Sequence, residues 1–142
     1  MSTNIDYLEC RVFKADVSEL DNLFEYSSKL LAILEFSSRE ITLINTALEE
    51  VFVNVAKYAY DEEGYVEVTV SNDRNSVKFV FRDSGKKFNP LEKQDPNITA
   101  SSDEREVGGL GIFMVKKIMD VVTYEYVNEQ NVLTLIKNRK HN

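Results

Sequence analysis

The sequence predicts an α+β fold: a two-layer sandwich with a mostly antiparallel, mixed sheet and helices on one face. Apolar side chains recur at every second position in residues 65–70 (Val66, Val68, Val70) and in residues 76–81 (Val77, Phe79, Phe81), as in β-strands. Only the polar residues 71–75 separate the two segments, as in a hairpin. Apolar residues recur at helical spacing in two segments before this hairpin and in one after it. A doubly wound parallel sheet would need strict alternation of strand and helix, which this order lacks.

Two consecutive helices are predicted before the hairpin. Asp16 or Ser18 is expected to cap the first helix, which runs to about Phe36. Ser38 is expected to cap the second helix, which ends near Tyr60. The apolar side chains of the second helix that are expected to face the core are Ile41, Ile44, Leu48, Val51, Val55 and Ala59.

The remaining segments complete a single domain over residues 1–142. A short strand is predicted at residues 8–13, and two more at 121–127 and 132–137. Residues 91–107 are polar and show no periodicity, which in so small a domain indicates either a functional loop or a disordered one. Three glycines then start a third helix that is expected to end near Met119.

Composition excludes several classes of function. The chain is 43% hydrophobic, which argues against disorder, and its net charge of −7 disfavours binding to nucleic acid. The lone histidine, His141, excludes a Ser-His-Asp triad and a zinc site. No apolar run is long enough to span a membrane, and the first residues lack a secretory signal. The single Cys10 fits a reducing compartment, so a cytoplasmic protein is expected.

The first of three motifs is the pair Glu50 and Asn54. Four residues apart on a helix, they share one flank beside the core-facing Val51 and Val55. An amide oxygen suits Mg²⁺ as a ligand, and a carboxylate can accept the proton of an attacking hydroxyl group. The alternative interpretation is an ordinary solvated helix face. Taken alone, these two residues favour this alternative.

The second motif follows the predicted strand 76–81. Asp83 continues the period-two pattern of Val77, Phe79 and Phe81, so it falls on the core face, where a carboxylate needs a partner. The amino group of adenine is one candidate partner, and Gly85 would let the backbone approach a flat ring. The alternative is a plain turn, because Asp-Ser-Gly is favourable turn chemistry. These residues alone leave the two interpretations evenly balanced.

The third motif is the run Gly108-Gly109-Leu110-Gly111, which leads directly into an apolar helical pattern. Backbone N–H groups at such a helix start can bind a phosphate, with the helix dipole behind them. The run is neither a Walker P-loop nor a Rossmann fingerprint, because no Gly-Lys-Ser/Thr follows it and no strand directly precedes it. The alternative is a flexible loop that ends in a helix.

Taken in this order, the three motifs resemble those of the GHKL ATPase superfamily, which has the Bergerat ATP-binding fold. Residues 47–60 resemble its N box, residues 81–90 its first glycine box, and residues 108–112 its second. The short chain and its Asp-x-Gly-x-x-Phe-Asn-Pro form are most similar to the bacterial anti-sigma-factor serine/threonine-protein kinases. The resemblance covers nearly the whole chain.

The resemblance implies that the chain binds ATP and Mg²⁺. By this resemblance, Glu50 would be the general base, Asn54 would hold Mg²⁺, Asp83 would read adenine, and residues 91–107 would form the ATP lid. The nucleotide contacts would come from Asn54, Tyr58, Asp83, Gly85, Phe88, Gly108, Gly109, Leu110 and Gly111.

The leading hypothesis is a cytoplasmic serine/threonine kinase that phosphorylates a small anti-anti-sigma-type protein and sequesters a sigma factor or similar partner. The chain departs from the family pattern at two places. Val107 stands where some members carry a basic residue near the terminal phosphate. Gln130, Asn131 and Val132 stand where related chains place Gly-Thr near adenine, so we expect a side-chain amide to replace that contact.

Two alternatives belong to other classes. An ATP-gated binding module without kinase activity is favoured by Val107 and disfavoured by Glu50. The catalytic half of a histidine kinase is disfavoured, because no acceptor histidine or helical hairpin precedes the motifs. The predicted first helix has enough apolar positions for a homodimer interface as well as a core.

Overall fold

The structure is a computed structural model that describes residues 8–92 and 107–139, with side chains from Gly111 onward in the second range. One five-stranded sheet has the order β1-β2-β3-β5-β4. Its strands are β1 (Leu8–Lys14), β2 (Tyr65–Asn72), β3 (Ser76–Asp83), β4 (Val121–Val127) and β5 (Gln130–Asn138). All four pairings between these strands are antiparallel. The predicted α+β class is therefore confirmed, and among the described strands no parallel pair makes the sheet mixed.

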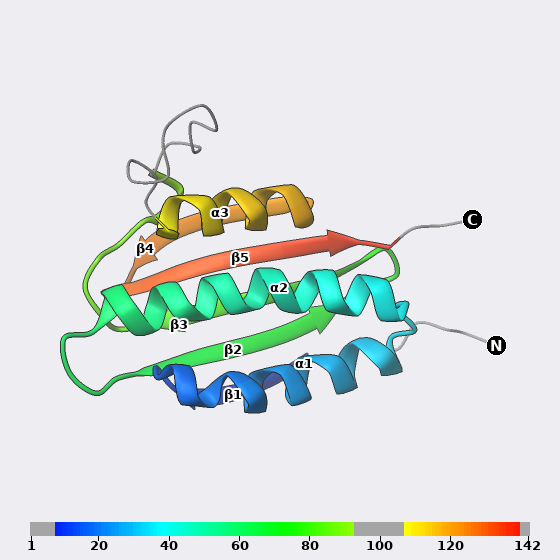
Figure 1. Ribbon diagram of the computed structural model, residues 1–142, viewed down its shortest axis with the longest axis horizontal. Helices are drawn as coiled ribbons and strands as arrows, with labels where there is room; N and C mark the ends of the chain where they lie inside the picture. Colours follow the sequence, from blue (N-terminus) through cyan, green and yellow to red (C-terminus); the bar gives the residue numbers. More distant parts are fainter. Residues whose placement is uncertain (1–7, 93–106, 140–142) are drawn as a thin grey trace.

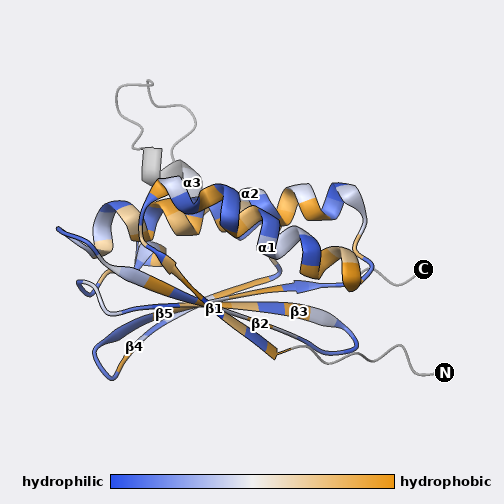
Figure 2. Cartoon of the chain, turned by 90° about the horizontal axis from the view of Figure 1, so that it is seen from below, coloured by the Kyte–Doolittle hydropathy of each residue, from blue (hydrophilic) through white to orange (hydrophobic). Residues whose placement is uncertain are grey.

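Three helices, α1 (Leu20–Ile33), α2 (Ser38–Asn54) and α3 (Val107–Ile118), cover one face of the sheet (Figure 1). Seen along the sheet, all three stand on the same side, and no helix of the described residues lies on the opposite face (Figure 2). The two-layer arrangement follows from strand periodicity, because Val66, Val68 and Val70 point inward while their neighbours point outward. No helix within residues 8–92 and 107–139 is long and apolar enough to cross a bilayer.

The interior lies between the helices and the sheet. Its largest fully buried side chains come from every layer: Phe13, Leu23, Leu31, Ile44, Leu48, Phe52, Phe79, Phe81, Ile112 and Leu135. Of the side chains predicted to face the core from the second helix, Ile44, Leu48, Val51 and Ala59 are buried and Ile41 and Val55 are partly buried. Helix α2 crosses the middle of the sheet, and its C-terminal end lies where β3 ends, β5 begins and α3 begins (Figure 1).

The start of α2 lies one residue before the sequence prediction, and α1 begins at Leu20, after a short turn. Ser37, not Ser38, caps α2: its hydroxyl accepts from the Glu40 N–H, and the Glu40 carboxylate accepts from the Ser37 N–H, both at 3.1 Å. This reciprocal pair is a capping box, which needs a glutamate three residues after the cap, and only Ser37 has one. Asp16 caps a short 3-10 turn, Val17–Glu19, that precedes α1.

The first helix is also shorter than predicted. Helix α1 ends at Ile33, and Glu35 takes a left-handed conformation, with φ of 66°, that turns the chain toward α2. The predicted end at Phe36 is wrong because apolar spacing continues through Leu34 and Phe36, which are both buried although they lie outside the helix. The Arg139 guanidinium donates to the Leu34 carbonyl at 2.6 Å and so satisfies one of the free carbonyls at this helix end.

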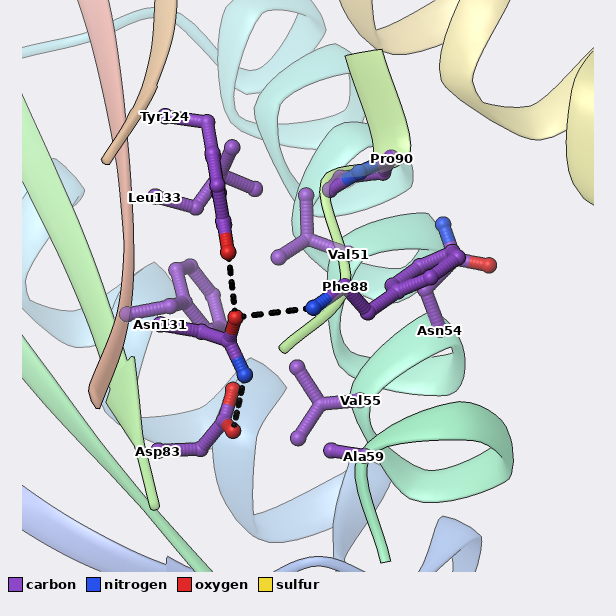
Figure 3. A pocket seen from close by; sticks show the side chains of 11 residues that line it. Val51, Asn54, Val55, Ala59, Asp83, Phe88, Pro90, Tyr124, Asn131 and Leu133 are labelled. Carbon is purple, nitrogen blue, oxygen red and sulfur yellow. Dashed lines mark hydrogen bonds between the residues drawn. The ribbon is translucent and has the colours of Figure 1, made fainter. Parts of the chain in front are cut away.

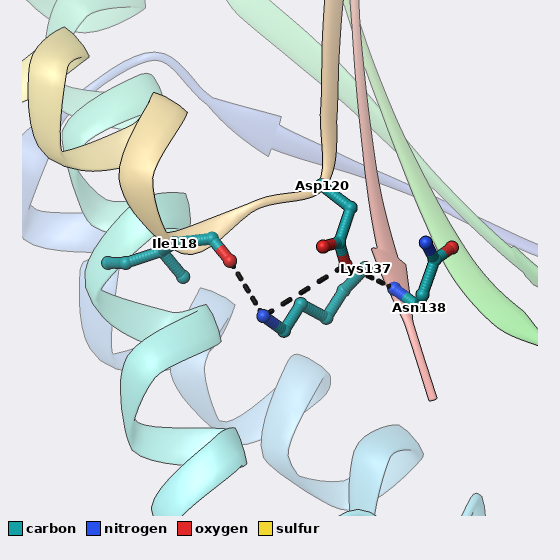
Figure 4. A network of polar contacts seen from close by, with 4 residues as sticks. All are labelled: Ile118, Asp120, Lys137 and Asn138. Atoms are coloured by element: carbon teal, nitrogen blue, oxygen red, sulfur yellow. Dashed lines mark hydrogen bonds and ion pairs between the residues drawn. The ribbon is translucent and has the colours of Figure 1, made fainter. Parts of the chain in front are cut away.

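The C-terminal end of α3 is held by β5. The Lys137 Nζ donates to the Ile118 carbonyl at 2.8 Å and lies 4.0 Å from Asp120 Oδ2 (Figure 4). The same Asp120 oxygen accepts from the Asn138 N–H at 2.7 Å. The Lys137 side chain is only 16% exposed, so this contact is shielded from water. A charged donor at a helix C-terminus also matches the helix dipole.

We predict that Lys137→Met lowers the free energy of unfolding by about 1.5–3 kcal/mol, because a charged donor is removed from a shielded carbonyl while the aliphatic volume is kept. Urea denaturation measures the change. Lys78→Met is the matched control, because Lys78 is exposed on β3 and should cost much less. Equal losses in the two variants would show that the contact to Ile118 contributes nothing.

Candidate functional site

A pocket lies at the end of the sheet where β3 ends and β5 begins (Figure 3). Most of its lining is apolar or aromatic, and the polar side chains in it are mainly a carboxylate and two amides. The lining residues are Val51, Asn54, Val55, Ala59, Phe81, Asp83, Phe88, Pro90, Tyr124, Asn131 and Leu133. Three residues predicted from two separate motifs, Asn54 from the first and Asp83 and Phe88 from the second, therefore meet in one place.

Asp83 is the buried carboxylate of this pocket. It is 5% exposed and faces the core, as the period-two pattern predicts. Its Oδ1 accepts from the Gly85 N–H and from Asn131 Nδ2, both at 2.9 Å. Burial raises the pKa of Asp83, and the hydrogen bonds from Asn131 and Gly85 act against that shift. Within the described residues nothing donates to Oδ2, so one oxygen is available as an acceptor.

Gly85 permits a close approach of two backbone segments. A Cβ atom at this position would lie 2.2 Å from the Ala59 carbonyl oxygen. The Lys86 N–H donates to that same oxygen at 2.7 Å. The sequence suggested that Gly85 leaves room for a flat ring, whereas in the structure the protein's own backbone fills the space. The glycine thus joins the segment after β3 to the end of the second helical stretch.

The helical stretch after α2 is a wide turn. Residues Val55–Ala59 form a π-helix, η2, where the sequence predicted an uninterrupted α-helix to Tyr60. Such widened turns are common at functional sites, because they redirect backbone groups that an α-helix would use internally. Tyr60 follows it, and its hydroxyl donates to the Tyr65 carbonyl at 2.6 Å and accepts from the Ser84 N–H at 2.9 Å. No spacing rule pointed to Tyr60, since it lies beyond the periodic segment.

Tyr58 and Phe88 form an aromatic pair at the pocket. Their ring centroids are 5.3 Å apart, with a tilt of 33°. Tyr58 is 41% exposed, whereas Phe88 lines the pocket. The cavity has a volume of about 30 Å³. That is on the order of one or two water molecules, so entry of a purine ring requires the lining side chains to move apart.

Glu50 lies against α3. A Cβ atom on Gly111 would be 2.2 Å from Glu50 Oε2 and 3.0 Å from its Cδ, so the glycine leaves the space that the carboxylate occupies. Glu50 is half-buried, and burial raises its pKa. The charge of Glu49 raises it further, and Lys57 lowers it. The predicted base is thus in direct contact with Gly111, the last of the predicted phosphate-binding glycines.

The second glycine motif lies inside a helix. Helix α3 begins at Val107, so Gly108, Gly109, Leu110 and Gly111 form its first turn and the start of the next. The N–H groups of a first helical turn lack internal partners, so the predicted anion contact needs no loop ahead of the helix. The predicted lid, residues 91–107, falls mostly outside the described residues. Of it the structure describes only Leu91 and Glu92, in a short 3-10 turn, and the backbone of Val107.

Asn54 is the remaining predicted ligand. It is 7% exposed and lines the pocket, yet its side chain has no hydrogen bond to any residue in the described ranges. The Asn54 amide atoms are not among the enclosed side-chain atoms that lack a partner, so they remain accessible to solvent and to a ligand. Within residues 8–92 and 107–139, no cluster of three or more histidine, cysteine or acidic side chains could hold a metal ion. A cation at Asn54 would therefore take most of its other ligands from phosphate or water.

We predict opposite outcomes for two glycine substitutions. Gly85→Ala should lower the free energy of unfolding by about 1–3 kcal/mol, because the new methyl group meets backbone that cannot move aside. Gly111→Ala should stay within about 1 kcal/mol of wild type, because alanine favours the helix and the flexible Glu50 side chain can swing away. Thermal and urea denaturation of both variants measures the difference. A Gly85→Ala protein as stable as wild type would contradict the close approach.

The sequence of this chain matches one protein family and is similar to several known proteins. Residues 13–137 match the family described as histidine kinase-like ATPase domain. The chain is similar to the anti-sigma F factor of Bacillus subtilis, 28% identical over 116 residues that span 80% of this chain and 78% of that protein. It is similar to the serine-protein kinase RsbW of Bacillus velezensis, 27% identical over 132 residues, covering 86% and 79%. It also resembles the serine/threonine-protein kinase BtrW of Bordetella bronchiseptica, 22% identical over 138 residues, covering 95% and 94%.

Two solved structures have the same fold. The RsbU and RsbW domains of a Mycobacterium tuberculosis protein match with a TM-score of 0.67 and 14% identity over 94% of this chain, which spans only 33% of that longer chain. A mycobacterial sensor histidine kinase, MprB, matches with a TM-score of 0.53 and 15% identity, covering 90% and 97%. The predicted resemblance to the GHKL superfamily and its anti-sigma-factor kinase branch is confirmed by these matches. Because the family match spans most of its length, this chain belongs to the histidine kinase-like ATPase domain family.

Proposed function

We propose that this protein is an anti-sigma-factor-like kinase that uses ATP and Mg²⁺ to phosphorylate a serine or threonine of a regulatory protein in the cytoplasm. One observation carries the proposal: Asp83, Asn54 and the Glu50–Gly111 contact gather at one end of the sheet. The names of the similar kinases and anti-sigma factor support it.

The base-binding part of the proposal rests on Asp83. Its Oδ2 can accept a hydrogen bond from the amino group of adenine, and Val51, Val55 and Leu133 supply apolar surface for the ring. Guanine presents a carbonyl oxygen at the corresponding position, which would face the carboxylate without a proton between them. The site should therefore prefer adenine nucleotides.

The phosphate side of the proposal rests on Asn54 and α3. The Asn54 amide oxygen would be a ligand to Mg²⁺, and the first-turn N–H groups of Gly108, Gly109 and Leu110 would bind phosphate oxygens. When bound, ATP supplies the phosphoryl group and Mg²⁺ neutralises part of its charge. Glu50 would accept the proton of the attacking hydroxyl group, and its raised pKa makes it a stronger base than an exposed glutamate.

The proposed partners follow from the named relatives. The substrate would be a small anti-anti-sigma-type protein, and the sequestered target would be a sigma factor or a similar regulator. Two further expectations stay predictions: nucleic acid and membranes are not partners, and α1 supports a homodimer. Light scattering at several protein concentrations tests the dimer.

We predict that Asp83→Asn weakens ATP binding by roughly ten- to a hundredfold, because the charged acceptor is lost while the shape is kept. Calorimetric titration of ATP and GTP, each with Mg²⁺, measures the affinities. Asp21→Asn is the control, since Asp21 is exposed on α1. If a folded Asp83→Asn protein binds ATP as wild type does, Asp83 does not read the base.

We predict that Glu50→Gln keeps ATP affinity nearly intact and lowers phosphoryl transfer by ~10²–10⁴-fold, the usual contribution of a general base. Phosphate incorporated into the partner protein is measured, with Glu49→Gln as the control. Wild-type transfer should fall as pH falls through the raised pKa of Glu50, because the protonated carboxyl cannot act as a base. In Glu49→Gln this fall should shift to lower pH, because the neighbouring charge that raises the pKa is gone.

Two results would contradict this assignment. Transfer by Glu50→Gln at the wild-type rate would place the base elsewhere. Wild-type protein that transfers no phosphate to its verified partner, while ATP still alters complex formation, would favour an ATP-gated binding module.

A further inference from the structure

Asn131, near the start of β5, is one of the few polar side chains that are almost fully buried, at 5% exposure. Its Nδ2 donates to Asp83 Oδ1 at 2.9 Å and to the Lys86 carbonyl at 2.8 Å. Its Oδ1 accepts from the Phe88 N–H at 3.0 Å and from the Tyr124 hydroxyl at 2.5 Å. Figure 3 shows it at the centre of these side chains, between Asp83 and Tyr124.

These four contacts use the whole hydrogen-bonding capacity of the Asn131 amide. An asparagine side chain has two N–H donors and one oxygen with two lone pairs, and here each has a protein partner. The orientation is also determined, because a flipped amide would place its oxygen against the Asp83 carboxylate and the Lys86 carbonyl. The Asn131 amide, which the sequence suggested as a replacement for an adenine contact, thus makes all of its hydrogen bonds to protein groups.

The hydrogen bond from Asn131 fixes the orientation of the Asp83 carboxylate. Both donors to the carboxylate, the Gly85 N–H and Asn131 Nδ2, meet at Oδ1. Rotation of the carboxylate would break these hydrogen bonds in a place that water scarcely reaches, and an unmade hydrogen bond to a buried charge is costly. Oδ2 is therefore held as the one acceptor that nothing in the described residues occupies.

We propose that Asn131 is a positioning residue that sets the base selectivity of the pocket by holding Asp83 Oδ2 as an acceptor for the amino group of a 6-aminopurine. The inference rests on the proposed nucleotide-binding function and deepens it. Asn131 also holds the backbone at Lys86 and Phe88, so the segment after β3 and the carboxylate are positioned by the same side chain.

The first test removes the amide. Asn131→Ala should bind ATP with Mg²⁺ roughly ten- to a hundredfold more weakly and bind GTP about as wild type does, so that the ratio of the two affinities shrinks by the same factor. Calorimetry measures both affinities, and circular dichroism checks the fold. The control is Asn138→Ala, in the same strand but exposed and at its opposite end. A merely structural role would weaken both nucleotides alike and leave their ratio unchanged, which would overturn the inference.

The second test keeps the shape and changes the chemistry. In Asn131→Asp, only a protonated carboxyl group can donate to Asp83 Oδ1, so the two carboxyl groups must share a proton for ATP to bind well. ATP affinity of this variant should be highest while the pair holds a single proton, and it should fall as rising pH removes that proton. Wild type should show no such fall.

The other groups that face Asp83 do not contribute to the pH dependence that this test measures. Tyr60 and Tyr124 lie near it, and burial raises the pKa of both hydroxyls, so they stay neutral over the range used. The residues that α2 and η2 contribute to the pocket, Val51, Asn54, Val55 and Ala59, do not ionise. The Lys86 ammonium group is paired with Asp61 at 2.6 Å.

The results separate two kinds of failure. Wild type that binds ATP selectively, together with an Asn131→Ala protein of unchanged selectivity or an Asn131→Asp protein whose ATP affinity does not fall with pH, would overturn the role of Asn131 alone. Wild type that binds neither nucleotide would overturn the proposed function, and this inference with it.

Discussion

The burial of one carboxylate constrains this end of the molecule more than any other feature. Asp83 is 5% exposed, and a charge in such a place is tolerated only with hydrogen-bond donors around it. Two donors are provided, and each imposes a structural condition. The Gly85 N–H requires a tight turn directly after β3, and the Asn131 amide requires that β5 lie beside β3 in one register. The pairing of Asp83 with Asn131 across the two strands meets the second condition.

The helices meet this arrangement from the other layer. Helix α2 crosses the sheet, and the wide turn at Val55–Ala59 places the Ala59 carbonyl where it accepts a hydrogen bond from the Lys86 N–H. This hydrogen bond fixes the turn after β3 to the helical layer. The approach is possible because position 85 has no side chain. The pocket is thus built from two layers joined by backbone, with Asp83 on one side and Asn54 on the other.

Two glycines of the site leave space for different neighbours. The space beside Gly85 is filled by the Ala59 backbone, which cannot move, whereas the space beside Gly111 is filled by the end of the flexible Glu50 side chain. The first contact therefore concerns stability and the second concerns the placement of a carboxylate beside the start of α3. Burial and the charge of Glu49 raise the pKa of this carboxylate.

The fold class, most element positions and the residues of the three motifs could be predicted from the sequence alone. These follow from local rules: period two in β2 and β3, period 3.6 in α2, and residue chemistry at Glu50, Asn54 and Asp83. The contacts that these residues make could not be predicted, because they depend on segments that come together only in the folded chain. The capping choice between Ser37 and Ser38 depends on a reciprocal hydrogen bond, and Gly85 depends on a segment far away in the chain. The role of Asn131 could not be predicted either, since hydrogen bonds to Asp83, Lys86, Phe88 and Tyr124 exist only once β3, β4 and β5 lie side by side. Periodicity shows which face a side chain takes, whereas its partner depends on which segments the fold brings within hydrogen-bond distance.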